Sequence, residues 1–441
     1  MALPRQSAAP ARFTEEQAEA KLRSLELFGM RFGLDRMRRM MTVLGSPERR
    51  FQTVQVLGTN GKSSTTRMLA AILERHGLRT GAYLSPHLVS YRERVRIGER
   101  EIDAEHFAAA IARAAWAAER VNRTLGEGDH VTQFELLTAA ALWQMAESDV
   151  EVAVIEAGLG GRYDATSVIE PRVSVLTNVG LEHTRWLGPT LKDIAEEKLA
   201  ALRPGATLVL GADLVPAARE VAERAAARCG ARILDAGAPA EGLLRARGSF
   251  QRRNFALAHA AAGAYLHSAG IALREQALAE AAAAVEVPGR LQLLAGEPLT
   301  ILDGAHNPDA VAALLEALPE VLEGGPLALV LGVLEDKDAS AMLAPLLPLC
   351  ERAWFTAPPS PRALPPAALA SLARQLGFSA STCEPAPARA LEHARRWARE
   401  HGGAVLATGS VYLVGDLLDS LGLVAAPNSG SAPANTSSGN R

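Results

Sequence analysis

Apolar runs alternate with helical stretches along most of this chain, and that alternation limits the folds open to it. Runs at 53–57, 172–177 and 206–210 are rich in β-branched residues, and each leads into a helical stretch. Thr132 and Glu135 form a capping-box pattern, which predicts a further helix before the apolar run "VEVAVIEA". Strands that alternate with helices are typical of a mainly parallel sheet covered by helices. We therefore predict an α/β fold.

The chain is expected to divide near residue 288. Its 441 residues exceed the size at which one hydrophobic core stops growing, so two domains are expected. The segment "EVPGRLQLL" then interrupts an alanine-rich helical region with a proline and a glycine. We predict a P-loop-type domain with a mainly parallel sheet over 1–287 and a smaller Rossmann-like α/β domain over 288–424. Residues 425–441 have almost no large apolar side chain, which predicts a disordered tail.

Several helix ends are also signalled by the sequence. Thr14 with Gln17 forms a capping box, and Gly29 is the expected end of that first helix. The alanine-rich segment 253–284 predicts two helices that are split near Gly270.

Composition excludes several classes of protein. A net charge of −3 and a pI near 6.4 give no basic surface for a nucleic acid. Three cysteines stand far apart without C-x-x-C spacing, so neither a disulfide framework nor a zinc site is expected. No signal peptide and no apolar run of membrane-spanning length is visible, which predicts a soluble cytoplasmic protein without a membrane partner.

A glycine-rich turn, "GTNGKSS", follows the strand at 53–57 and opens a helical pattern. A full Walker A loop would place a glycine where Val56 stands, so this is a shortened form. Backbone N–H groups at a helix N-terminus attract an anion, and Lys62 adds a point charge. A solvated lysine on an ordinary turn is the alternative. The hydroxyls available to a magnesium ion are those of Ser63, Ser64 and Thr65.

Polar residues also stand where two later strands end. Glu156 closes the strand in "VAVIEAGLGG", and His183 follows another strand in "VLTNVGLEHT". Strand ends of a parallel sheet converge on one crevice, so Glu156 is expected to reach a magnesium ion beside the phosphate loop. The alternatives are a surface carboxylate for Glu156 and a structural or solvent-facing ring for His183.

Nine motifs in order resemble those of the folylpolyglutamate synthase/dihydrofolate synthase family of the Mur ligase superfamily. The resemblance covers residues from about 20 to 420. It is carried by "GTNGKSS", "LSPHLVSYRERV", "TQFELLTA", "IEAGLGGRYDAT", "NVGLEHTRWLG", "PGRLQLL", "LDGAHNP", "GVLEDKD" and "TGSVYLVGDLL". The resemblance implies a Mur-ligase-like ATP-binding domain followed by a ligase domain.

The resemblance implies specific roles at an ATP and magnesium site. Two magnesium sites are implied, and Lys198 aligns with a lysine that is typically carbamylated in the family. A solvated charge is the alternative for Lys198, because it follows two glutamates on a helix. The family usually has glycine where Ser63 stands, which leaves open the hydroxyl that coordinates. The implied nucleotide contacts are Thr59, Asn60, Gly61, Lys62, Ser63, Ser64, Asn254, Arg290 and Asp303. The implied metal ligands are Ser64, Glu156, His183 and Lys198.

The resemblance also implies a substrate side. Ser85 and Arg94 are candidates for positioning an incoming amino acid, with help from Ser410 in the second domain. Thr132 and Phe134 are expected near a pterin pocket, although an ordinary core position also explains Phe134. His87 completes the implied set of substrate-binding residues.

The implied activity is an ATP-dependent ligase that adds L-glutamate to dihydropteroate, to a folate, or to both, through an acyl phosphate. Lys62, Lys198 and His306 are the implied catalytic residues, with His306 a conceivable general base. Small molecules are the implied partners, and the resemblance suggests a monomer. The alternatives are another Mur-type amide ligase, acting on a UDP-linked muropeptide, and an ATP-binding regulatory protein that has lost catalysis.

Overall fold

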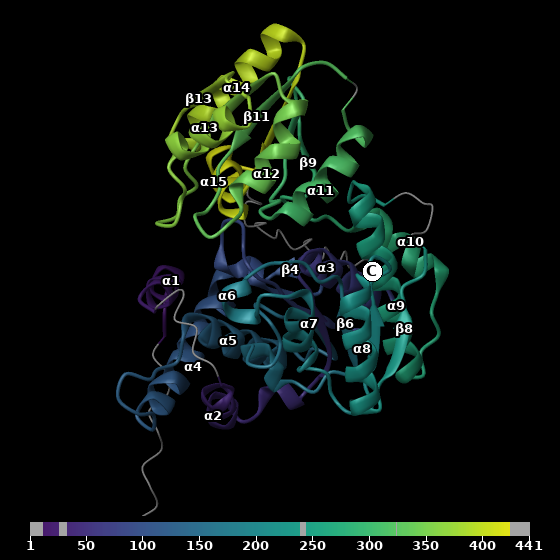
Figure 1. Cartoon of the computed structure of the whole chain (residues 1–441). Helices are drawn as coiled ribbons and strands as arrows, with labels where there is room; N and C mark the ends of the chain where they lie inside the picture. Colours follow the sequence, from purple (N-terminus) through teal and green to yellow (C-terminus); the bar gives the residue numbers. More distant parts are fainter. Residues whose placement is uncertain (1–11, 26–32, 239–243, 323, 424–441) are drawn as a thin grey trace, which may run out of the picture.

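The computed structural model describes residues 12–25, 33–238, 244–322 and 324–423, and within them the chain forms two sheets (Figure 1). The first sheet has eight strands in the order β4-β3-β2-β5-β1-β6-β7-β8. The second has six strands in the order β13-β12-β11-β14-β10-β9. The predicted α/β class is therefore confirmed, with a mainly parallel first sheet and a second sheet towards the C-terminus. Below, "first unit" denotes the described residues up to α10, and "second unit" those from β9 onward.

The first sheet is parallel across its centre, where β1 pairs with both β5 and β6. The β2–β3 and β3–β4 pairs at one edge are antiparallel. Central strands are buried on both faces, which explains the largely apolar sequences of β5 and β6. The strands are β1 (Gln52–Leu57), β2 (Thr80–Tyr83), β3 (Val95–Ile97), β4 (Arg100–Glu101), β5 (Val152–Glu156), β6 (Val173–Leu176), β7 (Thr207–Leu210) and β8 (Arg232–Asp235).

Side-chain alternation divides the first core into two layers. Val152 and Val154 pack with the helices α3 and α9 on one face, whereas Ala153 and Ile155 pack with α4 and α5 on the other. Further residues of the sheet pack with α7 and α8 in a neighbouring cluster. The helices are α1 (Glu15–Arg23), α2 (Asp35–Leu44), α3 (Lys62–Arg75), α4 (Ala104–Asn122), α5 (Gln133–Glu147), α6 (Thr184–Leu187), α7 (Leu191–Leu199), α8 (Pro216–Cys229), α9 (Ser249–Ser268) and α10 (Glu275–Ala284).

The second sheet is parallel apart from its β9–β10 pair. Its two faces are covered by α11, α12 and α13 on one side and by α14 and α15 on the other. The strands are β9 (Gln292–Leu294), β10 (Thr300–Leu302), β11 (Leu327–Leu331), β12 (Arg352–Phe355), β13 (Ser381–Cys383) and β14 (Ala404–Thr408). The helices are α11 (Pro308–Ala317), α12 (Ala339–Leu346), α13 (Pro366–Gln375), α14 (Pro387–His401) and α15 (Val411–Ser420).

Most local signals are confirmed. Capping boxes begin α1 at Thr14 and α5 at Thr132, and the region around Gly270 separates α9 from α10. Gly29 and the predicted tail at 425–441 lie outside the described residues. The exact division near residue 288 stays a prediction. Over the four described segments, no helix combines the length and the apolar character needed to cross a membrane.

Candidate active site

The glycine turn connects β1 to α3 and brings its backbone close to two neighbouring segments. Gly58 and Gly61 have φ angles of +148° and +79°, a region that favours glycine. A Cβ atom at Gly58 would strike the Thr177 hydroxyl, and one at Gly61 would strike the Asn254 amide. Helix α3 begins directly after Gly61, so its free N-terminal N–H groups border the turn. This is the backbone arrangement that a phosphate group needs.

Lys62 lies over the turn that it closes. Its Nζ atom donates to the carbonyl oxygens of Gly58, at 3.2 Å, and Thr59, at 2.9 Å. The side chain is only partly buried, so its charge at the turn is partly open to solvent. The turn is held in place by the Asn60 N–H, which donates to the Asn178 side chain at 2.8 Å.

Glu156 is a buried carboxylate and not a surface one. It is 1% exposed, and burial raises its pKa although the charge of Lys62 opposes the shift. The Ser63 hydroxyl donates to its Oε1 atom at 2.9 Å, and the Ser85 N–H donates to its Oε2 atom at 3.0 Å. The hydroxyl that the structure joins to Glu156 is thus that of Ser63. Ser64, the predicted magnesium ligand, is 3% exposed.

Lys198 is buried as well, so its alternative interpretation as a solvated charge is wrong. It is 4% exposed, and its Nζ atom donates to the Gly58 carbonyl at 2.7 Å. Burial lowers the pKa of Lys198 to about 7, helped by the charge of Lys62. Gly161 makes this burial possible, because a Cβ atom there would strike the Lys198 carbonyl. The glycine turn after β5 therefore lets α7 approach the phosphate loop.

These groups fit a magnesium ion that also binds phosphate. A carboxylate and hydroxyl oxygens are hard donors of the kind magnesium prefers, and the ion usually keeps waters and phosphate oxygens as its other ligands. In the part of the chain that the structure describes, no three His, Cys, Asp or Glu side chains form a metal-binding group. A fully protein-made cage is therefore not what these residues offer.

His183, the predicted ligand of a second magnesium, precedes α6. Its backbone has a φ of +53°, which is uncommon for a residue with a Cβ atom. Burial lowers the pKa of its ring to about 4, and the charges of Lys337, Lys62 and Lys198 act in the same direction. The ring is therefore neutral at pH 7, the form in which histidine binds metals.

Several predicted residues at the start of the second unit contact the backbone. Asp303 is 3% exposed and accepts hydrogen bonds from the N–H groups of Leu291 and Ala305, each at 2.8 Å. Burial raises the pKa of Asp303, and the charge of Arg290 opposes the shift. The charge of Arg290 also opposes the raised pKa of Glu156, which burial causes.

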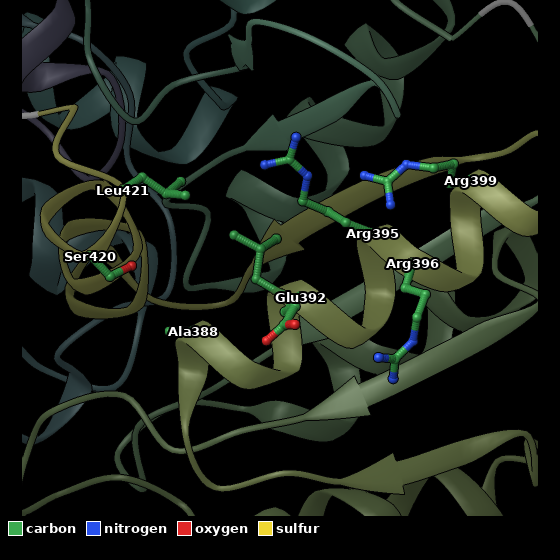
Figure 2. A pocket seen from close by; sticks show the side chains of 8 residues that line it. Ala388, Glu392, Arg395, Arg396, Arg399, Ser420 and Leu421 are labelled. Carbon is green, nitrogen blue, oxygen red and sulfur yellow. The ribbon is translucent and has the colours of Figure 1, made fainter.

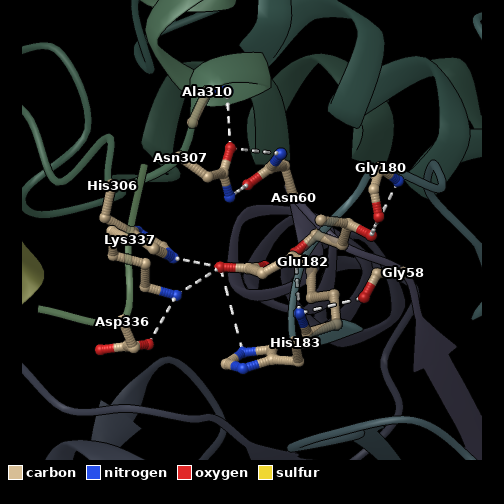
Figure 3. Close-up of polar contacts among 12 residues, drawn as sticks. Gly58, Asn60, Gly180, Glu182, His183, His306, Asn307, Ala310, Asp336 and Lys337 are labelled. Carbon is tan, nitrogen blue, oxygen red and sulfur yellow. Dashed lines mark hydrogen bonds and ion pairs between the residues drawn. The ribbon is translucent and has the colours of Figure 1, made fainter. Parts of the chain in front are cut away.

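His306 sits at the junction of the two units. Its Nδ1 atom lies 2.9 Å from the Gly304 carbonyl oxygen, and its Nε2 atom lies 3.2 Å from the Glu182 carboxylate (Figure 3). Both ring nitrogens therefore face acceptors, which leaves no nitrogen free to take a proton in this arrangement. Its role as a general base stays a prediction that requires His306 to leave Glu182.

Sequence reasoning missed two residues at this junction. Glu182 and Lys337 form an ion pair of 2.8 Å between the units. Both lie inside motifs that carried the family resemblance, "NVGLEHTRWLG" and "GVLEDKD". The signals that the sequence offered were the position of Glu182 directly before His183 and that of Lys337 between two aspartates.

The residues predicted to bind substrate have different surroundings in the structure. His87 accepts a hydrogen bond from the Arg94 side chain at 3.0 Å, and burial lowers the pKa of His87 to about 3. Ser410 and Thr132 accept backbone N–H groups as the N-caps of α15 and α5. The Phe134 ring covers Gly158 in the turn after β5 and lies 6.1 Å from the Tyr83 ring. Phe134 therefore packs against the glycine turn after β5. Ser410 and Thr132 each cap the N-terminus of the helix that they precede.

A pocket of about 470 Å³ lies elsewhere, between α14 and the end of α15 (Figure 2). It contains none of the predicted site residues. Its lining includes Leu391, Glu392, Arg395, Arg396, Arg399 and Leu421. The site above is instead defined by the phosphate loop and the junction of the units.

Known proteins share this sequence and fold. The Mur ligase, glutamate ligase domain family matches residues 289–411. The folylpolyglutamate synthase of Lacticaseibacillus casei is 34% identical over 363 residues, which are 76% of this chain and 84% of that protein. The dihydrofolate synthase/folylpolyglutamate synthase of Bacillus subtilis is 30% identical over 418 residues, 88% of this chain and 95% of that one.

A solved structure agrees with the sequence comparisons. The Mycobacterium tuberculosis folylpolyglutamate synthase complexed with ADP superposes with a TM-score of 0.86 at 30% identity, covering 92% of this chain and 98% of that one. The similarity extends over nearly the whole length of both chains, so the two proteins share the sequence motifs as well as the fold. The chain therefore belongs to the folylpolyglutamate synthase/dihydrofolate synthase family of Mur ligases.

Proposed function

We propose that this protein is an ATP-dependent ligase that joins L-glutamate to a carboxylate of a pterin-bearing acceptor. The acceptors are dihydropteroate and reduced folates, so one enzyme performs both glutamate additions as a monomer. The observation that carries the proposal is the placement of Glu156 and Lys198 against the phosphate loop, together with family membership. A protein that binds nucleotide for regulation alone has no need for two buried ionisable groups there.

The chemistry requires activation of the acceptor. A carboxylate is a poor electrophile in water, and transfer of the γ-phosphoryl group from ATP gives an acyl phosphate with a better leaving group. The N–H groups at the start of α3 and the Lys62 ammonium would stabilise charge on the transferring group by position and electrostatics. Magnesium, when bound by Glu156 and a hydroxyl of Ser63 or Ser64, would neutralise phosphate charge.

Lys198 is proposed to carry a carbamate. Its lowered pKa, about 7, leaves much of the amine neutral at physiological pH. A neutral amine forms an N–C bond to CO₂ and loses a proton, which yields an anion with two oxygens suited to magnesium. This anion would join Glu156 at the metal, and His183 would bind a second ion.

The second half of the reaction joins the amine. The glutamate ammonium loses a proton, its nitrogen attacks the acyl phosphate, and the tetrahedral intermediate collapses as phosphate leaves. We place the amino acid near Ser85 and Arg94, and the pterin near Phe134 and Thr132. The adenine side is assigned to Asn254 and Arg290, with the second unit, from near residue 288, closing over ATP.

The test is phosphate release from ATP with magnesium and L-glutamate in the presence of different acceptors. Dihydropteroate, tetrahydrofolate and a UDP-muropeptide are compared, and release with both pterins is expected. Release with one pterin would limit the protein to a single step. Release with the muropeptide alone, or with none of the three, would contradict the proposal.

A further inference from the structure

The carboxylate of Glu182 is the point at which the first unit contacts the Lys337 and His306 side chains of the second unit. Its side chain is 9% exposed and lies in the loop after β6. Its Oε1 atom lies 2.8 Å from Lys337 Nζ and 3.2 Å from His306 Nε2. Figure 3 marks both contacts with dashed lines. The Lys337 side chain is 10% exposed, with Asp336 at 3.5 Å as a second acidic neighbour. A single oxygen thus fixes side chains from two loops of the second unit.

The energetics explain why these three groups depend on one another. A buried charge is costly unless it is paired, and removing one partner leaves the others uncompensated. Hydrogen bonding to His306 and the charges of His306 and Lys337 hold the pKa of Glu182 well below its usual range despite burial. Loss of the Glu182 carboxylate would therefore leave the Lys337 ammonium without its nearest acidic partner.

A second contact connects the phosphate loop itself to the second unit. Asn60 Nδ2 donates to Asn307 Oδ1 at 3.2 Å, and Asn307 Nδ2 donates to Asn60 Oδ1 at 3.0 Å. Asn307 Oδ1 also accepts from the Ala310 N–H, which caps α11. Two amides with both groups paired have one favourable orientation, so this contact sets the register of the units at the loop.

Three lysines lie around the phosphate loop and the loop after β6. The Nζ atoms of Lys62 and Lys198 both donate to the Gly58 carbonyl oxygen, and Lys337 pairs with Glu182, the residue next to His183. Lys62 and Lys198 come from the first unit, whereas Lys337 comes from the second. A cluster of cations within a partly desolvated site is suited to an anion with several charges.

We infer that Glu182 is a positioning residue, which holds the second unit so that Lys337 and His306 face the anion bound at the phosphate loop. The inference deepens the proposed ligase function and rests on it. Glu182 neutralises Lys337 in the present arrangement, and the incoming phosphate charge would then compete for the same ammonium. Loss of Glu182 would therefore misplace the Lys337 and His306 side chains without altering the phosphate loop.

The chain offers a matched control for this inference. Glu320 pairs with Arg252 of α9 at 2.7 Å, and this ion pair also links the two units. Its side chains are 33% and 38% exposed, and it is built from α9 rather than from the loop after β6. Glu320→Gln therefore removes an inter-unit ion pair of the same kind away from the phosphate loop.

The experiment compares Glu182→Gln with Glu320→Gln. For Glu182→Gln we expect kcat to fall about 10- to 100-fold while the KM for ATP changes less than about threefold, as for misplacement of reacting groups. Glu320→Gln should keep both constants. Small-angle X-ray scattering on the same proteins should give a larger radius of gyration for Glu182→Gln and an unchanged one for Glu320→Gln.

A second variant guards against misfolding. Lys337→Met should lower kcat similarly, and the double variant Glu182→Gln/Lys337→Met should be no worse than the more affected single variant, because both act through one contact. Wild-type kcat and scattering in Glu182→Gln, or equal losses in Glu320→Gln, would overturn the inference. A wild-type enzyme without ligase activity would instead refute the proposed function, and the scattering would still decide whether Glu182 holds the units together.

Discussion

The two sheets place polar residues at equivalent positions, where strands end, but use them differently. At the edge of the first sheet, Glu156 and the nearby Lys198 are buried beside the charge of Lys62. At the edge of the second, Asp303 accepts two backbone N–H groups, and Ser410 caps α15. The first edge buries ionisable groups beside the phosphate loop, whereas the second uses Asp303 and Ser410 to hold its own backbone.

This difference indicates that the two units have different roles in the site. The Lys198 Nζ atom carries two N–H donors as a neutral amine and three as an ammonium, and among the described residues it has one hydrogen-bond acceptor, the Gly58 carbonyl. A buried group with unused hydrogen-bonding capacity is poorly stabilised without a ligand. The second unit instead provides rigid loops that bring His306 and Lys337 to the junction. Substitutions at the first edge should therefore impair catalysis, and those at the second should reduce stability.

Lys62→Ala should have the largest effect on activity. The side chain contacts two loop carbonyls and is partly exposed, so its loss removes a charge from the anion site while the core stays packed. We expect phosphate release to fall by at least about 100-fold, as for other groups that stabilise transition-state charge. Lys192→Ala, which removes an exposed lysine paired with Glu220, is the control. Wild-type turnover in Lys62→Ala would exclude the phosphate-loop assignment.

Lys198→Ala should also be slow, and it tests the carbamate. We expect a loss of about 10- to 1,000-fold, partly restored by a short carboxylate such as acetate in the buffer, because that anion can replace the carbamate oxygens. Independently of activity, wild-type protein in ¹³C-bicarbonate should give a carbamate carbon signal that Lys198→Ala lacks. The same signal in both proteins, or equal activity, would rule out a carbamate on Lys198.

The most direct comparison of the two edges pairs Glu156→Gln with Asp303→Asn. In Asp303→Asn one backbone N–H would face an NH₂ group, which should lower the free energy of unfolding by about 1–3 kcal/mol in urea titrations. In Glu156→Gln both contacts can persist, because the amide oxygen accepts from the Ser85 N–H and the NH₂ group donates to the Ser63 hydroxyl, so the free energy of unfolding should stay within about 1 kcal/mol of wild type. Instead, phosphate release by Glu156→Gln should depend less strongly on the magnesium concentration. An Asp303→Asn protein with unchanged stability would break the comparison.

The pH dependence of the free energy of unfolding should also reveal the burial of Lys198. Its pKa is about 7 in the folded protein, against about 10.4 for an ordinary lysine. Between these pH values the unfolded chain binds more protons, so this lysine makes the free energy of unfolding rise from about pH 7 to about pH 10. Lys198→Met should flatten that rise in bicarbonate-free buffer. Parallel curves of unfolding free energy against pH for the wild type and Lys198→Met would show that the pKa of Lys198 is not lowered by folding.

Much of this organisation could be predicted from the sequence because it is local. Glycines, capping boxes and strand ends are encoded by neighbouring residues, and the turn before α3 and the strand end at Glu156 were identified in this way. The orientation of α3 about its own axis depends on packing against distant residues. This orientation determines that Ser63 rather than Ser64 contacts Glu156. The burial of Lys198 depends on Gly161, which lies far away in the sequence and lets α7 approach.

The junction of the units could not be predicted in the same manner. The contact between Glu182 and Lys337 joins loops 155 positions apart and depends on how two separately folded sheets meet. Hydrophobic periodicity defines each sheet but carries no information on that relative placement. The motifs pointed to the right loops, and the geometry was needed to identify the residues that touch.

The most direct test of the ligase proposal follows the oxygen atoms. An acceptor labelled with ¹⁸O in its reacting carboxylate is incubated with the protein, ATP, magnesium and unlabelled L-glutamate, and the released phosphate is analysed by mass spectrometry. Activation through an acyl phosphate predicts one ¹⁸O atom in each phosphate, together with an acceptor that has gained one glutamate. Phosphate without ¹⁸O would mean that water attacks ATP, and it would contradict the proposed function.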